Sequence, residues 1–206
     1  MIRSVGSCFA EDPRRCAREA VILFDACTDC SVLGCDVIAG EGDFDLSAIG
    51  CFSALLRGQE ACEHLVVADG MRRIRLDVTG GTMLDGPVRL CFRLEGLMAI
   101  EAPLLTLRRL SALSQLRRMP RLLFPADRRA PRGVLALRAG DAWRCGASQR
   151  EVAEAIFGGE RVRSEWNGSS DYMRSQVRRM LRHARRMTGG GWRALVSAAD
   201  VSATPN

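Results

Sequence analysis

The sequence predicts an α+β protein in which a small β-containing domain precedes a helical domain. Short apolar runs with a period of two are found in the first half, whereas apolar residues after Ala102 recur at helical spacing. The charge also changes between the halves, since residues 1–100 contain 10 arginines against 15 acidic residues and residues 101–206 contain 20 against nine. We expect an acidic domain over residues 1–100, a leucine-rich connecting helix over 101–119, a basic helical domain over 120–198 and a tail over 199–206.

The strands predicted in the first half rest on alternation. Residues 64–69 and 71–78 flank a single glycine and predict a β-hairpin. Residues 88–94 alternate apolar and polar side chains and predict a third strand, with a helix as the open alternative. Residues 20–24 predict a short buried strand, and residues 43–46 predict the start of a loop or a single turn.

Proline, glycine and a capping pattern predict the helix boundaries of the second half. Leucines at helical spacing predict a helix over residues 104–116, which Pro120 ends. This helix is a candidate for an interdomain or subunit contact, and equally for a place in the core. Pro131 suits the first turn of the next helix. Ser148 and Glu151 form a capping box that predicts a third helix, which ends at Gly158.

The most informative segment is residues 170–187, where an apolar stripe at helical spacing runs beside a basic face. Ser170 is expected to cap this helix, and no acidic residue follows Asp171. Arginines without an acidic partner repel one another, so they favour an external polyanion, most commonly nucleic acid. A merely basic solvated surface is the alternative. The six arginines are Arg174, Arg178, Arg179, Arg182, Arg185 and Arg186.

Composition argues against several classes of protein. No run of 18 apolar residues is present, so no membrane span is expected, and the N-terminus lacks the pattern of a signal peptide, which predicts a cytoplasmic protein. There are only two histidines, no glycine-rich phosphate loop and no histidine–carboxylate pairing at a recognisable spacing. We therefore expect neither catalysis nor a cofactor.

Nine cysteines are present, but their odd number and irregular spacing do not indicate a disulfide framework. Cys27, Cys30 and Cys35 supply three thiols within nine residues, and a tetrahedral zinc site needs four ligands. No second pair of cysteines with the same spacing supplies the fourth. Reduced, partly buried cysteines are the favoured interpretation, and a structural zinc or iron–sulfur site is the alternative.

Three segments of the second half resemble the C-terminal DNA-binding domain of the RovC-like transcription regulators of proteobacteria. They are RLLFPADRRAPRGVLALRAGDA, GASQREVAEAIFGGERV and SDYMRSQVRRMLRHARRMTGGGWRALV. The first half is also similar, through RRIRLDVTGGTMLDGPVRLCFRLEGL, so that the resemblance extends roughly over residues 20–196. It implies a helix-turn-helix-type regulator, tied in some relatives to conjugative elements or secretion systems.

The resemblance also implies which residues face DNA. Those matching the start of the first DNA-facing helix are Ser148, Gln149 and Arg150, and those matching the recognition helix are Ser170, Arg174, Ser175, Arg178 and Arg179. The connection over residues 158–169 is longer than in a simple helix-turn-helix. On physical grounds we expect Arg174 and Arg178 towards the groove, and phosphate contacts from Arg182, Arg185, Arg186 and the linker residues Arg128, Arg129 and Arg132.

The sequence therefore predicts a sequence-specific, duplex-DNA-binding transcriptional regulator, with a mobile-element or secretion-system operon as the candidate target. Self-association is expected, because one small module supplies few contacts to a specific site. The alternative is a protein-interaction module, similar to an antiactivator, that docks on a related regulator. DNA binding requires the arginines to be exposed and free of acidic neighbours, whereas an interaction module would expose an apolar patch.

Overall fold

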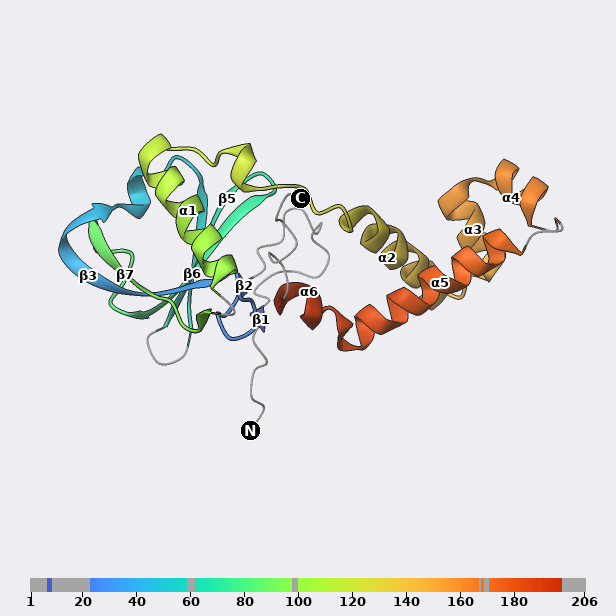
Figure 1. The fold of residues 1–206 in the computed structure, drawn as a ribbon, viewed down its shortest axis with the longest axis horizontal. Coiled ribbons are helices and arrows are strands. Elements are labelled where there is room, and N and C mark those ends of the chain that lie inside the picture. Colours follow the sequence, from blue (N-terminus) through green and yellow to red (C-terminus); the bar gives the residue numbers. More distant parts are fainter. Residues whose placement is uncertain are drawn as a thin grey trace. The chain divides into compact units, whose positions relative to one another are not determined.

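A sheet of five strands with one long helix forms the first of two units in the chain (Figure 1). The computed structural model describes residues 7–8, 23–58, 62–97, 100–166, 168 and 171–197. The first unit comprises Met1–Pro125 and Ala194–Asn206, and the second comprises Ala126–Arg193. The mixture of strands and helices confirms the predicted α+β class.

The strand order in the sheet is β4-β5-β6-β3-β7. The central pair β3 and β6 is parallel, with Leu33 opposite Leu76, and the other neighbours are antiparallel. Two further short strands, β1 and β2, pair with each other. The strands are β1 (Ser7–Cys8), β2 (Leu23–Phe24), β3 (Leu33–Phe44), β4 (Phe52–Arg57), β5 (Glu63–Asp69), β6 (Arg72–Gly80) and β7 (Val88–Arg93).

Three sequence predictions for this unit are confirmed. β5 and β6 form the hairpin, with Gly70 in the turn at a φ of 62°, a conformation that glycine adopts without strain. β7 is a strand rather than a helix. β2 falls within the strand predicted at residues 20–24, of which residues 20–22 lie outside the described residues. The predicted burial of this strand also lies outside what the structure describes.

The strand β3 was not predicted, and the loop expected at residues 43–46 is wrong in part. β3 continues to Phe44, and a single 3-10 turn, η1 (Leu46–Ala48), follows it. The register against β7 shifts between Ala39 and Phe44, so the intervening residues bulge. A Cβ on Gly42 would lie 1.8 Å from the carbonyl carbon of Val88, so only glycine fits there. Glycines and a bulge obscure the alternation that would reveal the strand.

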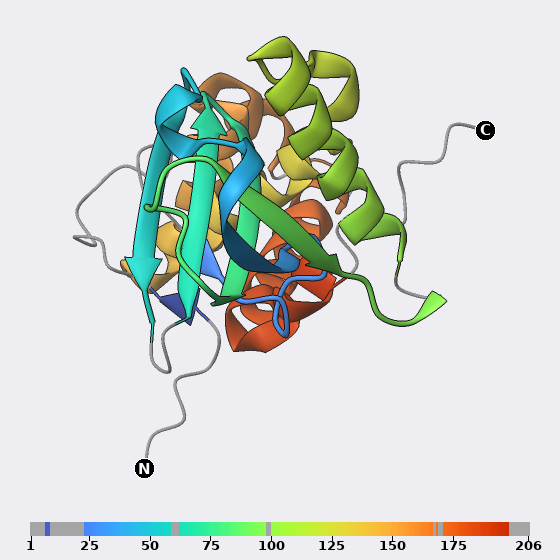
Figure 2. The ribbon, with the colours of Figure 1, turned by 90° about the vertical axis from the view of Figure 1, so that its left-hand side faces the viewer.

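The leucine-rich helix α1 (Glu101–Leu116) packs on the sheet against β3 and β6 (Figure 2). Leu110 and Leu113 are buried in the same core as the inward-facing residues of the strands. The hydroxyl of Thr106 donates to the carbonyl of Ser31 (2.7 Å), which ties the helix to the start of β3. Of the two roles expected for this helix, the structure therefore shows the role in the core.

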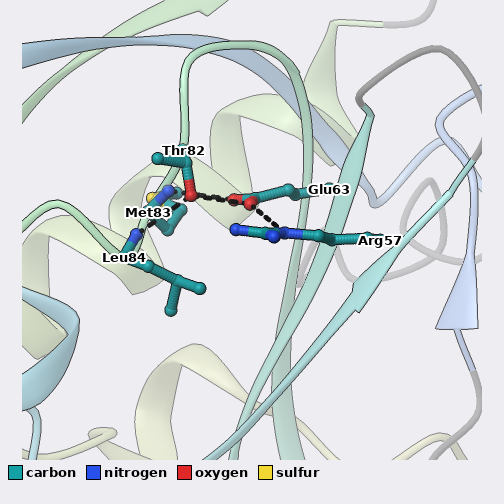
Figure 3. A network of polar contacts seen from close by, with 5 residues as sticks. All are labelled: Arg57, Glu63, Thr82, Met83 and Leu84. Atoms are coloured by element: carbon teal, nitrogen blue, oxygen red, sulfur yellow. Dashed lines mark hydrogen bonds and ion pairs between the residues drawn. The ribbon is translucent and has the colours of Figure 1, made fainter.

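A buried carboxylate holds the segment that links β6 to β7 (Figure 3). The side chain of Glu63 is 3% exposed, and it accepts from the hydroxyl of Thr82 (2.6 Å) and the backbone N–H of Met83 (2.9 Å). Nε of Arg57 completes the network at 3.2 Å. Burial alone would raise the pKa of Glu63, but these hydrogen bonds outweigh burial and lower it. The carboxylate thus remains ionised at neutral pH.

The second unit is helical, and the structure confirms the helix signals predicted from its sequence. Pro131 lies in the first turn of α2, and Ser148 with Glu151 forms the predicted capping box of α3, with hydrogen bonds of 2.7 and 3.3 Å. Gly158, at a φ of 88°, ends α3. The elements of this unit are α2 (Ala130–Arg144), α3 (Gln149–Phe157), α4 (Gly159–Glu165), α5 (Tyr172–Arg186) and a π-helical turn η5 (Met187–Gly191). The last helix, α6 (Arg193–Ser197), begins at the final residue of the unit.

From Ala194 onward the chain belongs to the first unit again. There the carbonyl of Val196 in α6 accepts from the thiol of Cys30 at 3.5 Å. None of the helices within the described ranges is both long and apolar enough to span a bilayer.

Candidate functional site

The buried face of α5 defines which of its arginines can reach a partner. Met173, Val177, Leu181 and Ala184 are at most 5% exposed and lie in or beside the core that α5 shares with α2 and α3. These positions recur every three or four residues, so one stripe of the helix is fixed inward. The arginines consequently lie along the flanks and the outward face.

Four arginines on the C-terminal half of α5 are exposed and have no acidic partner among the residues that the structure describes. The guanidinium of Arg185 lies over the ring of Trp143, 5.3 Å from its centroid. Arg186 donates to Nδ1 of His183 at 3.0 Å. These contacts orient the two side chains without neutralising them. The four are Arg179, Arg182, Arg185 and Arg186.

The expectation that all six arginines lack an acidic partner is wrong for Arg174 and Arg178. Asp171 pairs with both, through Oδ1 with Nε of Arg174 at 2.6 Å and through Oδ2 with a terminal nitrogen of Arg178 at 2.5 Å. Ser175 joins the network, since its hydroxyl lies 3.3 Å from Asp171 and accepts from Arg178 at 3.1 Å. Hydrogen bonding from Arg178, together with Arg174, lowers the pKa of Asp171, which keeps the carboxylate charged.

The same aspartate begins the helix. α5 starts at Tyr172 with Asp171 at the N-cap, rather than with the predicted Ser170, and the aspartate side chain makes no capping hydrogen bond to the backbone. Ser170 itself lies outside the described residues. The carboxylate is therefore bound to arginine side chains, although its negative charge still suits the positive end of the helix dipole.

The predicted residues at the start of α3 are largely engaged in their own helix. The hydroxyl of Ser148 accepts from the backbone of Glu151, and the half-buried Gln149 is the first residue of the helix. Nε of Arg150 lies 3.2 Å from Glu154, one turn further on. These contacts hold the first turn of α3, although Ser148 and Arg150 are still exposed.

The predicted linker arginines surround the N-terminus of α2. Arg128, Arg129 and Arg132 are all exposed, and Arg129 is the residue at the N-cap. Asp127 accepts from the backbone N–H of Arg129 at 2.7 Å. Three positive side chains near the positive end of a helix dipole repel one another, and an external anion would relieve that repulsion.

The helix α4 was missed, because glycines at residues 158 and 159 suggest an end rather than a new beginning. Val162 anchors α4 in the helical core, and Arg161 pairs with Glu165 at 2.9 Å. The predicted departure from a simple helix-turn-helix therefore has a structural basis: a short helix separates α3 from α5.

The cysteine cluster does not form a site among the described residues. Cys27 is exposed, Cys30 is half-buried and Cys35 is buried in the sheet, where burial raises the pKa of its thiol to about 12. Within the described ranges no group of three or more histidine, cysteine or acidic side chains could hold a metal ion.

Comparison with known proteins found a matching family model. It is described as the DNA-binding domain of a type VI secretion system (T6SS) transcription factor, of RovC type, and it matches residues 91–197. The match covers more than half of the 206 residues and includes the second half of β7, all of α1 and every helix of the second unit. No curated protein matches the chain.

Proposed function

Because the chain belongs to the RovC family of transcription-factor DNA-binding domains, and is thus a DNA-binding transcription regulator, we propose that it reads duplex DNA with α5 and controls a secretion-system or mobile-element operon. The residues proposed to contact DNA lie on α5 and at the N-terminus of α2. The family match supports the class of activity, and the geometry of α5 supports the choice of helix.

The observation that carries this proposal is the outward face of α5. Arg179 and Arg182 are exposed without an acidic partner in the described part of the chain, while the opposite stripe is buried. A guanidinium presents a planar set of donors that fits phosphate, and each neutralised phosphate releases condensed counterions from the duplex. This face therefore provides positive charge that no acidic side chain within the described ranges neutralises.

The test compares wild type with the double variant Arg179→Ala/Arg182→Ala, using duplex DNA from upstream of the neighbouring genes at several salt concentrations. Each lost phosphate contact should reduce the slope of log K against log salt by about 0.9, so we expect a change of about two. The matched control is Arg144→Ala/Arg161→Ala, which removes the same charge from arginines already paired with Asp141 and Glu165. The control should change the slope by less than half as much.

Equal slopes for wild type and the α5 variant, with both proteins folded, would contradict this role of α5. The protein-interaction module would then become the leading function, since Asp171 places one acid on this helix. Retention of a protein partner by the wild type but not by the α5 variant would support that alternative.

Self-association belongs to the same proposal. Val134 and Leu137 on α2 are 54% and 53% exposed, and a helix of a monomer gains little by displaying two aliphatic side chains on one face. A second copy of the chain would bury them and would double the DNA contacts. A solution mass equal to a single chain at micromolar concentration would contradict self-association.

A further inference from the structure

We propose that Asp171 positions Arg174 to recognise guanine, so that this aspartate sets sequence specificity rather than affinity. The inference rests on the proposed function, because it assumes that α5 enters a groove of duplex DNA. Its basis is the set of contacts in the first two turns of α5. These contacts separate the two arginines paired with Asp171 from the four that have no acidic partner among the described residues.

The carboxylate of Asp171 is itself held in place by contacts with Ser175 and Arg178. Its Oδ2 contacts the terminal nitrogen of Arg178 at 2.5 Å and the hydroxyl of Ser175 at 3.3 Å, and Arg178 also donates to Ser175 at 3.1 Å. Three contacts among these residues restrict the rotation of the Asp171 side chain. Its other oxygen, Oδ1, is directed to Nε of Arg174 at 2.6 Å.

The contact leaves a useful part of Arg174 exposed. Nε of Arg174 is buried and meets Asp171 as an ion pair whose geometry is not that of a hydrogen bond. The side chain as a whole is 42% exposed, so the exposure comes from its other atoms. The two terminal amino groups make no hydrogen bond to a described residue. Two parallel N–H donors fit O6 and N7 of guanine in the major groove, and an arginine restrained by an ion pair at Nε has fewer orientations in which to present them.

A restrained guanidinium and a freely moving one are suited to different parts of DNA, the first to base edges and the second to phosphates. Arg179 and Arg182 lack an acidic partner among the described residues and can follow phosphates of any sequence. Arg174 shares its charge with Asp171, so its net attraction to phosphate is reduced, whereas its donors remain directed. The pairing of Asp171 with Arg174 therefore weakens non-specific attraction to DNA and strengthens discrimination between bases.

The experiment selects bound sequences from a randomised duplex library with wild type, Asp171→Asn, Arg174→Lys and Glu165→Gln. Asparagine is as good an N-cap as aspartate, so α5 should persist, and circular dichroism checks this. Arg174→Lys keeps the charge but loses the planar fork. Glu165→Gln removes one negative charge from another arginine pair of the same unit and serves as the control.

Wild type should enrich a motif containing guanine, and Asp171→Asn and Arg174→Lys should each reduce the preference for the same guanine about tenfold. Asp171→Asn should also steepen the salt slope by about one, since Arg174 or Arg178 becomes available to phosphate. Glu165→Gln should keep the motif. An unchanged motif in Asp171→Asn, or an equal loss of the guanine preference in Glu165→Gln, would overturn the role of Asp171 but leave the proposed function standing. A wild type that enriches no sequence would refute the proposed function as well.

Discussion

The contact between α2 and α5 depends on Gly140, and replacing it should displace the arginine helix. An ideal Cβ built on Gly140 lies 2.8 Å from the Cβ of Ala184. Two methyl-sized groups pack at about 3.5–4.0 Å, so Gly140→Ala requires the helices to separate by roughly 1 Å. Gly133 lies in the same helix with nothing within 4 Å of its Cβ position, which makes Gly133→Ala the matched control.

The magnitude follows from two opposing effects. Replacing a helical glycine with alanine gains about 0.5–1 kcal/mol, because the unfolded chain loses conformational freedom. Both variants share this gain. Overpacking at Gly140 costs about 1–3 kcal/mol, so the free energy of unfolding should be lower in Gly140→Ala than in Gly133→Ala by that amount.

Tryptophan fluorescence during urea unfolding measures this difference in the relevant unit. All three tryptophans, Trp143, Trp166 and Trp192, belong to the second unit, so their emission follows its unfolding alone. Gly133→Ala should unfold at higher urea concentration than wild type, and Gly140→Ala at lower concentration. Equal midpoints for the two variants would refute the close approach of α2 and α5 on which the orientation of the arginines depends.

Two further predictions concern the buried Glu63. Glu63→Ala removes the acceptor of the Met83 N–H and the Thr82 hydroxyl, so it should lower the free energy of unfolding by about 2–4 kcal/mol. Glu63→Gln keeps one acceptor oxygen and should lower it less. Hydrogen exchange of residues 80–87 measures both effects. Because the folded pKa of Glu63 lies below its ordinary value of 4.5, its stabilisation is complete above pH 4.5 and is lost as the pH falls through the folded pKa. Protection of the β5–β6 amides should therefore fall with acid in wild type more than in Glu63→Gln, and equal pH profiles would contradict this.

Local signals predicted local structure well. The capping box at Ser148, the proline in the first turn of α2 and the glycine turn of the β5–β6 hairpin each act through neighbouring residues, and the structure confirms all three. The stripe of α5 was predicted for the same reason, since Met173 and Val177 are one turn apart. Such elements need no knowledge of the rest of the chain.

Features that depend on distant partners could not be predicted. The central strand β3 combines a parallel pairing with β6 and a bulge opposite Val88, and neither leaves a pattern within its own twelve residues. The buried state of Glu63 depends on Thr82 and Met83, about twenty residues away. Only the three-dimensional register brings these groups together.

The positions of the acids, rather than the number of arginines, determine where the second unit carries usable positive charge. Residues 126–193 contain 15 arginines and seven acidic residues. Of these acids, Asp141, Glu154 and Glu165 each pair with an arginine within one helical turn, Asp171 pairs with two, and Glu151 caps α3. Spacing within one helical turn predicts the pair of Asp171 with Arg174, but it does not predict the pair with Arg178, which lies two turns away. That second pair fixes the carboxylate, and it leaves Arg179, Arg182, Arg185 and Arg186 as the arginines of α5 without an acidic partner among the described residues.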